Sequence, residues 1–333
     1  MKTLILKGTE KVDFEEHERL QAVGRDIVVK ISGAGICGTD LASYRSGVAM
    51  GFGHEMAGVV CEVGDESTIL VGTRVFVSNL SKNLVSYKPE KHGAYIGGFA
   101  EYLLIKNAEL GEDVFEIPDT LDDEEAALVE PFCVGMSGVK KYPFSENSHV
   151  VIYGAGIIGM CALMYMLSKG VKNPVVVDFN EIRLQRVKEA GAIPFSAAKG
   201  ELKEFLTEQF GTAVSATAGT VPNVDVYIDC VGAASIPREV LGMAKVDSQL
   251  TVLGVHHKPV ETDFMSIMYN RLRVMGSVMF TKEDIKEAIV LLAEDKKICR
   301  SLITHKIPFS EAERAFQVAS DADAALKVIM VNK

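Results

Sequence analysis

The stretch of residues 149–178 constrains the fold of this chain more than any other segment. A β-branched run is followed by the glycine pattern GAGIIG at 154–159, then by an apolar segment and a second short β-branched run. Gly154 permits a tight turn, and Gly156 lets backbone N–H groups approach a phosphate at the helix N-terminus. Gly159 lets the helix pack closely on the strand. The stretch therefore predicts a strand, a glycine turn, a helix and a second strand.

The second strand ends in Asp178, nineteen residues beyond Gly159. A carboxylate at this spacing can accept hydrogen bonds from the ribose of an adenine dinucleotide. Two other interpretations compete. The first is an ordinary turn, because glycine patterns occur in many turns that bind no ligand. The second is a membrane span, because the uncharged run 150–167 is close to the ~18 residues that suggest one. The strand–helix context and the later acid favour a dinucleotide site, and the glycines divide the apolar run into two shorter elements.

Length and charge narrow the class of protein further. At 333 residues the chain exceeds the usual size of one hydrophobic core, so we expect two domains. A net charge of −10 without a basic block argues against nucleic acid and anionic membranes as partners. Charge resumes soon after the N-terminus, so we expect no signal peptide. Six scattered cysteines without a CxxC pair indicate free thiols in a reducing compartment, and we expect a cytoplasmic protein.

The first part of the chain has the pattern of a β-rich domain. Apolar, β-branched runs separated by glycine and charge predict strands at 2–7, 26–31, 57–63, 74–77 and 99–105. Residues 78–97 are polar and without periodicity, which predicts a long loop. Acids in the first turn mark a helix start at 122–128.

From residue 149 onward, strand and helix patterns alternate. We expect strands at 150–153, 175–178, 224–229, 249–253 and 272–276. We expect helices at 157–169, 181–190, 201–209, 236–244 and 283–294. Alternation at this spacing predicts a parallel, doubly wound sheet and an α/β fold class. We place this domain at 148–277, and the first domain at 1–147 with 278–333 completing it.

Three short segments carry residues that bind metals. Cys37 lies in GICGTD, His54 and Glu55 lie in GHE, and Glu130 precedes Pro131. A thiolate, an imidazole and a carboxylate form the three-ligand set of a catalytic zinc, which leaves one position open. Each residue also has an ordinary alternative: a small buried hydrophobe for Cys37, a hydrogen-bonded core residue for His54, and a helix-cap partner for Glu130.

The whole chain resembles a known family through motifs that occur in the same order. These motifs are GICGTD, FGHEMAGVV, GGFAEYLLI, LVEPFCV, GAGIIG, VDVYIDCVG and VLGV. The sequence is similar to the zinc-dependent medium-chain alcohol dehydrogenases, and most of all to their polyol and L-threonine dehydrogenase branch. The resemblance implies a GroES-like β-rich catalytic domain, a Rossmann domain, one catalytic zinc and NAD(P)-linked oxidation of a small alcohol.

The resemblance also implies roles for individual residues. It makes Cys37 and His54 zinc ligands and leaves open whether Glu55 or Glu130 is the third. Thr39 would pass the substrate's proton toward the cofactor ribose, while Asp40 would either orient His54 or cap a short helix. The cofactor-binding residues would be Gly154, Gly156, Ile157, Ile158, Gly159, Asp178, Arg183, Val231, Leu253, Gly254 and Val255.

Asp178 favours NAD over NADP, because its carboxylate would repel a 2′-phosphate on the ribose. Arg183 is the residue that could neutralise such a phosphate, and we expect it to lie against the adenine instead. Two other functions stay open from the sequence. They are a zinc-free reductase of the same superfamily and an NAD-binding protein without catalytic activity.

The chain departs from the family pattern in three places. Residues 78–97 lack the cysteines of the family's structural-zinc lobe, so we expect one zinc per chain. Ala42 stands where many relatives carry a histidine that relays the proton. Only sixteen residues separate Cys37 from His54, which predicts a short and open wall of the substrate cleft. Tyr44 and Phe52 would either line that cleft or pack into the β core.

The segment 272–280 is apolar enough to form an exposed sheet edge. In relatives the last Rossmann strand pairs with its own copy, and an unpaired apolar edge would invite aggregation. We therefore expect a homodimer, or a homotetramer built from such dimers.

Overall fold

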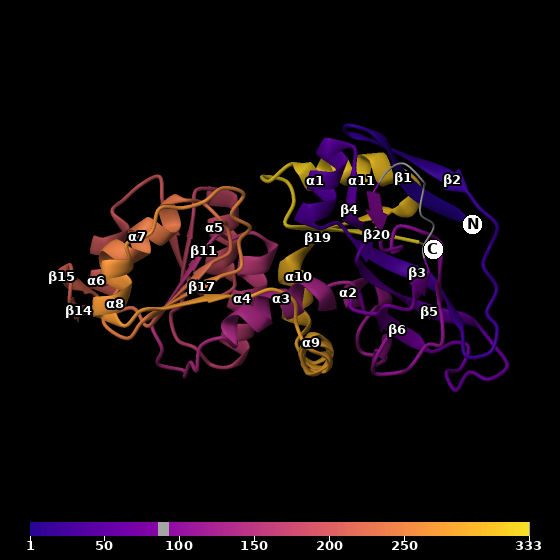
Figure 1. The fold of residues 1–333 in the computed structure, drawn as a ribbon, viewed down its shortest axis with the longest axis horizontal. Helices are drawn as coiled ribbons and strands as arrows, with labels where there is room; N and C mark the ends of the chain where they lie inside the picture. The colour runs from indigo at the N-terminus through magenta and orange to yellow at the C-terminus, as the bar shows by residue number, and fades with distance from the viewer. Residues whose placement is uncertain (86–92, 333) are drawn as a thin grey trace. The chain divides into compact units, whose positions relative to one another are not determined.

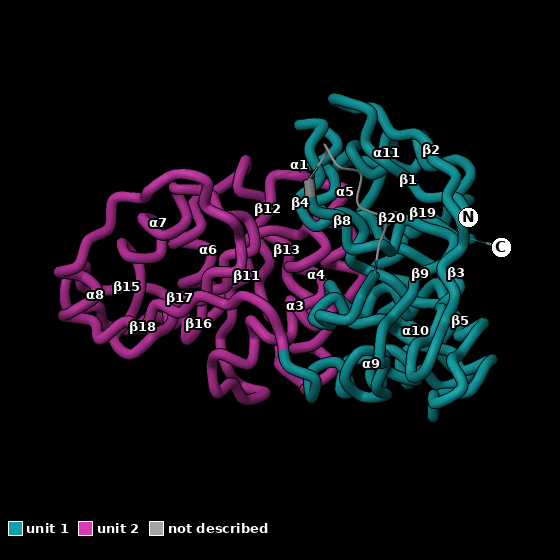
Figure 2. The backbone as a smooth tube through the Cα atoms, turned by 45° about the vertical axis from the view of Figure 1, so that its right-hand side comes forward, with its two compact units in different colours: residues 1–131, 281–333 teal, residues 132–280 magenta. Residues whose placement is uncertain are grey.

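The computed structural model describes residues 1–85 and 93–332. The chain forms two compact units, Met1–Pro131 with Thr281–Lys333 and Phe132–Phe280 (Figure 2). The sequence places the corresponding boundaries at 147/148 and 277/278. Helix α3 (Val129–Val139) accounts for the earlier start of the second unit, because a Cβ on Gly135 would lie 2.7 Å from the backbone nitrogen of Ala162 in α4 (Ile157–Ser168). The two helices thus pack backbone to backbone.

The first unit is built on an eight-stranded sheet. Its main path runs β10-β6-β5-β3-β20-β19, and β9 pairs with β3 and β7. The bounds are β3 Ile27–Gly35, β5 Glu55–Val63, β6 Arg74–Val77, β7 Leu84–Val85, β9 Tyr102–Ile105, β10 Val114–Glu116, β19 Ile303–Pro308 and β20 Lys327–Val331. Since β20 pairs antiparallel with β3, the end of the chain completes a sheet that the first part begins. The predicted β-rich fold is confirmed.

Smaller elements surround this sheet. Strand β1 (Lys2–Gly8) pairs with β2 (Lys11–Glu16), and β4 (Ala49–Phe52) pairs with β8 (Gly93–Tyr95). The first strand and the last strand of the chain, β1 and β20, both lie in this unit (Figures 1 and 2). Its helices are α1 Gly38–Ser46, α2 Asp123–Ala126, α9 Lys282–Glu294, α10 Lys296–Leu302, η1 Phe309–Glu311 and α11 Ala312–Ser320.

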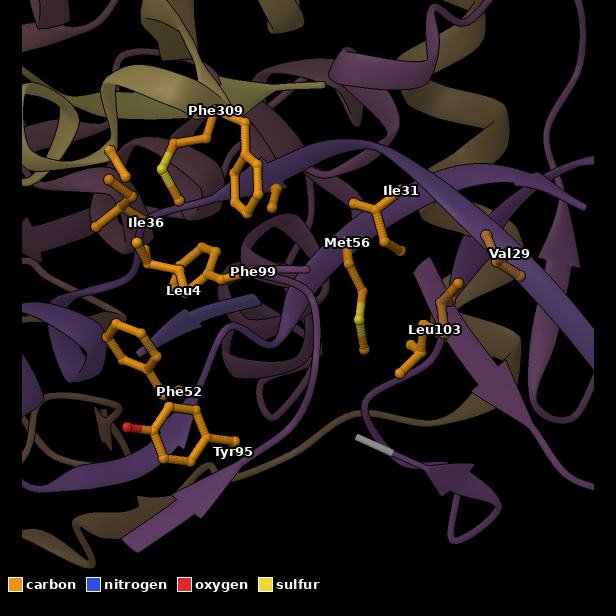
Figure 3. Packing of buried hydrophobic residues seen from close by; sticks show 14 of the residues in the cluster. Leu4, Val29, Ile31, Ile36, Phe52, Met56, Tyr95, Phe99, Leu103 and Phe309 are labelled. Atoms are coloured by element: carbon orange, nitrogen blue, oxygen red, sulfur yellow. The ribbon is translucent and has the colours of Figure 1, made fainter. Parts of the chain in front are cut away.

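An aromatic cluster forms part of the core of the first unit (Figure 3). The ring centroid of Phe52 lies 4.8 Å from that of Phe99 and 5.6 Å from that of Phe316. Tyr44 packs on Phe316 at 5.1 Å, and its hydroxyl donates to Glu313 Oε1. Tyr44 and Phe52 are both buried in this core, which agrees with the second of the two alternatives predicted for them, packing into the β core.

The described parts of the predicted long loop at 78–97 contain two short strands, β7 and β8, while residues 86–92 lie outside the described residues. The buried carboxylate of Asp113 holds the start of this segment. Its Oδ1 accepts hydrogen bonds from Ser81 Oγ and Asn83 Nδ2, and its Oδ2 accepts one from the backbone N–H of Glu109. Hydrogen bonds to one buried carboxylate therefore anchor the start of this segment, which contains no cysteine.

The second unit is a parallel, doubly wound sheet (Figure 1). Its strand order is β13-β12-β11-β16-β17-β18, which matches the 3-2-1-4-5-6 order of a dinucleotide-binding fold. The strands are β11 Val150–Tyr153, β12 Val175–Asp178, β13 Ile193–Ser196, β16 Val226–Asp229, β17 Gln249–Val252 and β18 Arg273–Gly276. The further helices are α5 Glu181–Glu189, α6 Leu202–Phe210, α7 Ser235–Met243 and α8 Phe264–Asn270. The predicted fold class is confirmed, although sequence patterns missed β13, α8 and the hairpin of β14 (Thr212–Ser215) and β15 (Gly219–Pro222).

The glycine turn between β11 and α4 has the geometry that its sequence requires. Gly154 has a φ of +96°, which a residue with a side chain rarely adopts. A Cβ on Gly159 would lie 1.8 Å from the carbonyl oxygen of Gly154, so a glycine is required for the helix to approach the strand. Among the described residues, none of the helices combines the length and apolar content needed to cross a membrane.

Candidate functional site

The candidate metal ligands of the first unit meet where β3 and β5 lie side by side. Cys37 follows β3 and is the N-cap residue of α1, while His54 and Glu55 stand at the start of β5. One ligand atom from each of Cys37, His54 and Glu55 lies within 4.8 Å of the other two. Glu55 is completely buried, and the other two are partly exposed. The arrangement is compact enough for one metal ion.

Asp40 joins the two segments that carry these ligands. Its Oδ2 accepts the backbone N–H of Cys37 at 2.8 Å, and its Oδ1 accepts the backbone N–H of Gly53 at 2.9 Å. The same Oδ1 lies 3.8 Å from Nδ1 of His54. Asp40 therefore caps α1, as one of its two predicted roles requires, and its carboxylate also lies near His54. Burial raises the pKa of Asp40 to about 6.

The orientation of the imidazole suits metal binding. Nδ1 of His54 lies 2.9 Å from the carbonyl oxygen of Gly51 and is placed to donate to it. This contact leaves Nε2 as the nitrogen available to a metal, as in other metal-binding histidines. Burial alone would lower the pKa of His54, but the hydrogen bond with Cys37 and the charge of Asp40 outweigh burial and raise it to about 11. The surroundings of His54 thus favour the protonated, positively charged form of its imidazole.

The two candidate carboxylates have different partners. Nζ of Lys327 donates to both carboxylate oxygens of Glu55 at 2.7 Å and to the carbonyl oxygen of Ile36 at 2.9 Å. Glu130 Oε1 accepts a hydrogen bond from Asn79 Nδ2 at 3.1 Å. Burial and the neighbouring charge of Glu55 raise the pKa of Glu130 to about 7. Among the described residues, the compact three-ligand group includes Glu55 and not Glu130.

Lys327 is not among the residues predicted from the sequence, although one signal points to it. It is the single charged residue of the otherwise apolar strand KVIMV, and its side chain is only 1% exposed. A lysine inside a buried strand requires a buried carboxylate as its partner. Gly35 makes room for that partner, since a Cβ there would lie 1.9 Å from Glu55 Oε2.

The chemistry of this donor set fits zinc. Acidic groups outnumber the one lysine here, because the thiol of Cys37 and the carboxyl groups of Glu55 and Glu130 all lie near Lys327. A divalent cation would balance that surplus of negative charge. Thiolate, imidazole and carboxylate together are typical of zinc rather than of calcium or magnesium.

Other predicted residues of this unit lie on the exposed side of α1. The side chains of Thr39 and Ala42 are exposed, whereas Asp40 and Ser43 are buried on the opposite face. Thr39 follows the cluster residue Cys37 by two positions.

The second unit contains a pocket of about 720 Å³ at the carboxyl ends of its strands. Five predicted cofactor residues line it, namely Gly154, Gly156, Asp178, Arg183 and Val231. Within the described residues the lining does not include Ile157, Ile158, Gly159, Leu253, Gly254 or Val255. Gly159 acts instead in helix packing, and the Leu253 side chain packs on Gly138 of α3. Phe179, Phe195 and Ser235 also line the pocket and are not among the residues predicted from the sequence.

Asp178 is held by the backbone of the turn that it faces. Its Oδ2 accepts the N–H of Ala155 at 2.7 Å, and its Oδ1 accepts the N–H of Asn180 at 2.8 Å. Each carboxylate oxygen can accept further hydrogen bonds, so the group can also receive ribose hydroxyls. One guanidinium nitrogen of Arg183 lies 3.7 Å from the position of a Cβ on Gly156, above the glycine turn. The contact of Arg183 with adenine stays a prediction.

The two sites together define a class of protein. A doubly wound unit with a phosphate-binding type of glycine turn binds dinucleotides, and a buried Cys-His-Glu group in a β-rich unit suits a catalytic zinc. The combination is that of a metal-dependent dehydrogenase.

Family models agree with this class and make it specific. The model of the alcohol dehydrogenase GroES-like domain matches residues 24–119, and the model of the zinc-binding dehydrogenase matches residues 158–294. The chain belongs to the zinc-dependent medium-chain alcohol dehydrogenase family. It is an oxidoreductase whose substrates are small alcohols and whose cofactors are zinc and a nicotinamide dinucleotide.

Individual relatives are distant but align over nearly the whole chain. The sorbitol dehydrogenase of Halalkalibacterium halodurans is 25% identical and covers 91% of each chain. The D-xylulose reductase of Saccharomyces cerevisiae is 25% identical over 89% of this chain and 87% of its own. Among solved structures, the 2R,3R-butanediol dehydrogenase from Bacillus subtilis has a TM-score of 0.84, with 22% identity over 100% of this chain and 99% of its own.

We predict that Asp40→Ala lowers zinc affinity by about ten- to a hundredfold, because it removes the acceptor that joins the two ligand segments. Competition with a chelator measures the change. Asp284→Ala is the matched control, since Asp284 belongs to a capping box on α9 in the same unit. Equal affinity in the Asp40 variant and the control would contradict the prediction.

Proposed function

We propose that this protein oxidises polyols or related secondary alcohols with NAD, at a zinc ion held by Cys37, His54 and Glu55. The observation that carries the proposal is the compact group of these three ligand atoms, all within 4.8 Å of one another in the first unit. The names of the sequence relatives, sorbitol dehydrogenase and D-xylulose reductase, support a polyol or its ketone as the substrate.

Glu55 is the proposed third ligand because it belongs to the compact group, whereas Glu130 is bound by Asn79. Lys327 donates hydrogen bonds to both carboxylate oxygens of Glu55, which orients this carboxylate within the group. In this proposal Glu130 stays hydrogen-bonded to Asn79 beside the site.

In this proposal, the bound zinc supplies Lewis-acid chemistry that lowers the pKa of the substrate hydroxyl, and NAD accepts the hydride. The residues of the chain orient the substrate and move its proton. Thr39 Oγ receives the proton from the substrate hydroxyl and releases its own to the cofactor ribose or to solvent. The exposure of Thr39 and Ala42 supports a direct path to water, which makes a histidine at position 42 unnecessary.

The test begins with metal analysis of the purified protein, which should give one zinc per chain. Cys37→Ser should lose both the metal and nearly all turnover while the unit stays folded, because its core does not depend on Cys37. Cys61→Ser is the control, since Cys61 is another partly exposed free cysteine of the same unit. A screen of polyols, amino alcohols and secondary alcohols, read by absorbance of the reduced cofactor, identifies the substrate. Full activity after complete metal removal would contradict the proposal.

For the cofactor, we predict a preference for NAD over NADP of about a hundredfold in kcat/KM. Like charges ~5 Å apart at an effective dielectric of ~20 repel by about 3 kcal/mol, which corresponds to that factor. Asp178→Ala should lower the ratio of kcat/KM for NAD to kcat/KM for NADP. The control is Glu181→Ala, which removes a nearby exposed carboxylate at the start of α5 and should leave this ratio unchanged. Equal efficiency of the native enzyme with both cofactors would refute this preference.

For assembly, we propose a homodimer, or a tetramer of such dimers, formed through β18. This strand is the edge of the six-stranded sheet, and the apolar side chains of Val274, Met275, Val278 and Met279 are exposed on or beside it. An exposed apolar edge of this kind normally pairs.

Light scattering of the native protein should therefore give at least twice the mass of one chain. Val278→Asp should shift the mass to that of a monomer, because Val278 is 84% exposed and a buried charge would oppose pairing. Val214→Asp, at another exposed valine of the same unit, should not change the mass. A monomeric native protein at micromolar concentration would refute the proposed dimer.

A further inference from the structure

We propose that His256 is a positioning residue for the nicotinamide half of the cofactor. Through the buried carboxylate of Asp229 it ties the segment after β17 to the segment after β16, and so fixes the surface on which that half binds. The inference rests on the proposed NAD-dependent function and adds a residue to it.

Asp229 connects the two segments through five hydrogen bonds. It is the last residue of β16 and is completely buried. Its Oδ1 accepts the N–H groups of Val231 and Gly232 at 2.9 and 2.8 Å. Its carbonyl oxygen accepts the N–H groups of Leu253 and Gly254, which follow β17, at 2.9 and 2.8 Å. One buried residue thus anchors the starts of both segments.

His256 makes the fifth bond and extends this anchor along the second segment. Its Nε2 lies 2.8 Å from Asp229 Oδ2, and its side chain is only 18% exposed. A hydrogen bond to a buried carboxylate is stronger than one between neutral groups. His256 therefore restrains residues beyond Gly254, which the backbone bonds to Asp229 do not reach. Its neighbour His257 is exposed.

The two segments also touch along their backbones. A Cβ on Gly254 would lie 2.1 Å from the backbone nitrogen of Gly232, and a Cβ on Gly232 would lie 2.4 Å from the carbonyl oxygen of Val255. Glycine at both positions permits this close approach. With His256 bound to Asp229, the segments form one continuous surface.

The place of this surface in the sheet assigns it to the nicotinamide half. In a doubly wound fold of this order, each half of the sheet binds one mononucleotide of the cofactor. The glycine turn and Asp178 belong to β11 and β12, which form the adenosine half. Asp229 and His256 follow β16 and β17, in the other half.

The restrained segments carry apolar side chains suited to a planar ring. Val231 and Val255 are 51% and 65% exposed, although both are aliphatic. Val231 also lines the 720 Å³ pocket that Asp178 lines. The segment after β16 therefore adjoins the pocket of the adenosine half. A surface held in place before binding saves the entropy of ordering it, which raises affinity for the part of the ligand that it contacts.

The test compares NADH with ADP-ribose, which lacks the nicotinamide ring, in calorimetric titrations of the zinc-loaded full-length protein. His256→Ala should weaken NADH binding by about tenfold or more, the scale of one lost charge-assisted hydrogen bond. ADP-ribose affinity should stay within about twofold, because that ligand lacks the ring that the surface would contact. With NAD as the varied substrate, KM should rise more than kcat falls.

Two further variants separate positioning from a loss of stability. His256→Gln should restore most of the NADH affinity, because its amide nitrogen can still donate to Asp229, while the shorter side chain of His256→Asn cannot reach it. His257→Ala should match the native protein in both titrations. If His256→Ala does not fold, the difference between the Gln and Asn variants decides the question.

Equal loss of NADH and ADP-ribose affinity, or no loss of either, would overturn the role of His256. Failure of the native protein to bind both ligands would overturn the proposed dinucleotide function instead.

Discussion

The candidate metal centre depends on a buried ion pair between Lys327 and Glu55. Taking a carboxylate out of water costs several kcal/mol unless a partner compensates it, and here a lysine donates to both of its oxygens. That lysine is delivered by β20, which pairs with β3 and so brings the end of the chain beside Cys37. The metal ligands can be assembled only when this strand is in the sheet.

The second unit uses the same principle with backbone donors in place of a lysine. Asp178 and Asp229 each end a central parallel strand, and each accepts N–H groups from the turns around it. Carboxylates at the ends of two strands, of which Asp229 is completely buried, thus hold the adjoining turns through backbone N–H groups. His256 adds one side-chain donor to this scheme, at the position where the second half of a dinucleotide would bind.

Prediction from the sequence succeeded where local pattern and tertiary environment agree. Strands β11 and β12 are buried on both faces, and their continuous β-branched runs end at glycine or acid, so the predicted bounds match the structure. Strand β13 contains Pro194, and the hairpin of β14 and β15 is short and partly exposed, so neither gave a recognisable pattern. Both candidate sites were located because their residues occur in short motifs, as with His54 and Glu55.

The amino-acid sequence alone determined the glycine turn, the acid after β12 and the three metal-ligand types, because each depends on residues close together in the chain. Tertiary structure decided the rest. It buried Tyr44 and Phe52 in the core, and it placed Lys327, 272 residues away, on Glu55. It also brought His256 to Asp229. Such pairs are set by strand order in the two sheets, and strand order depends on long-range packing that no local pattern encodes.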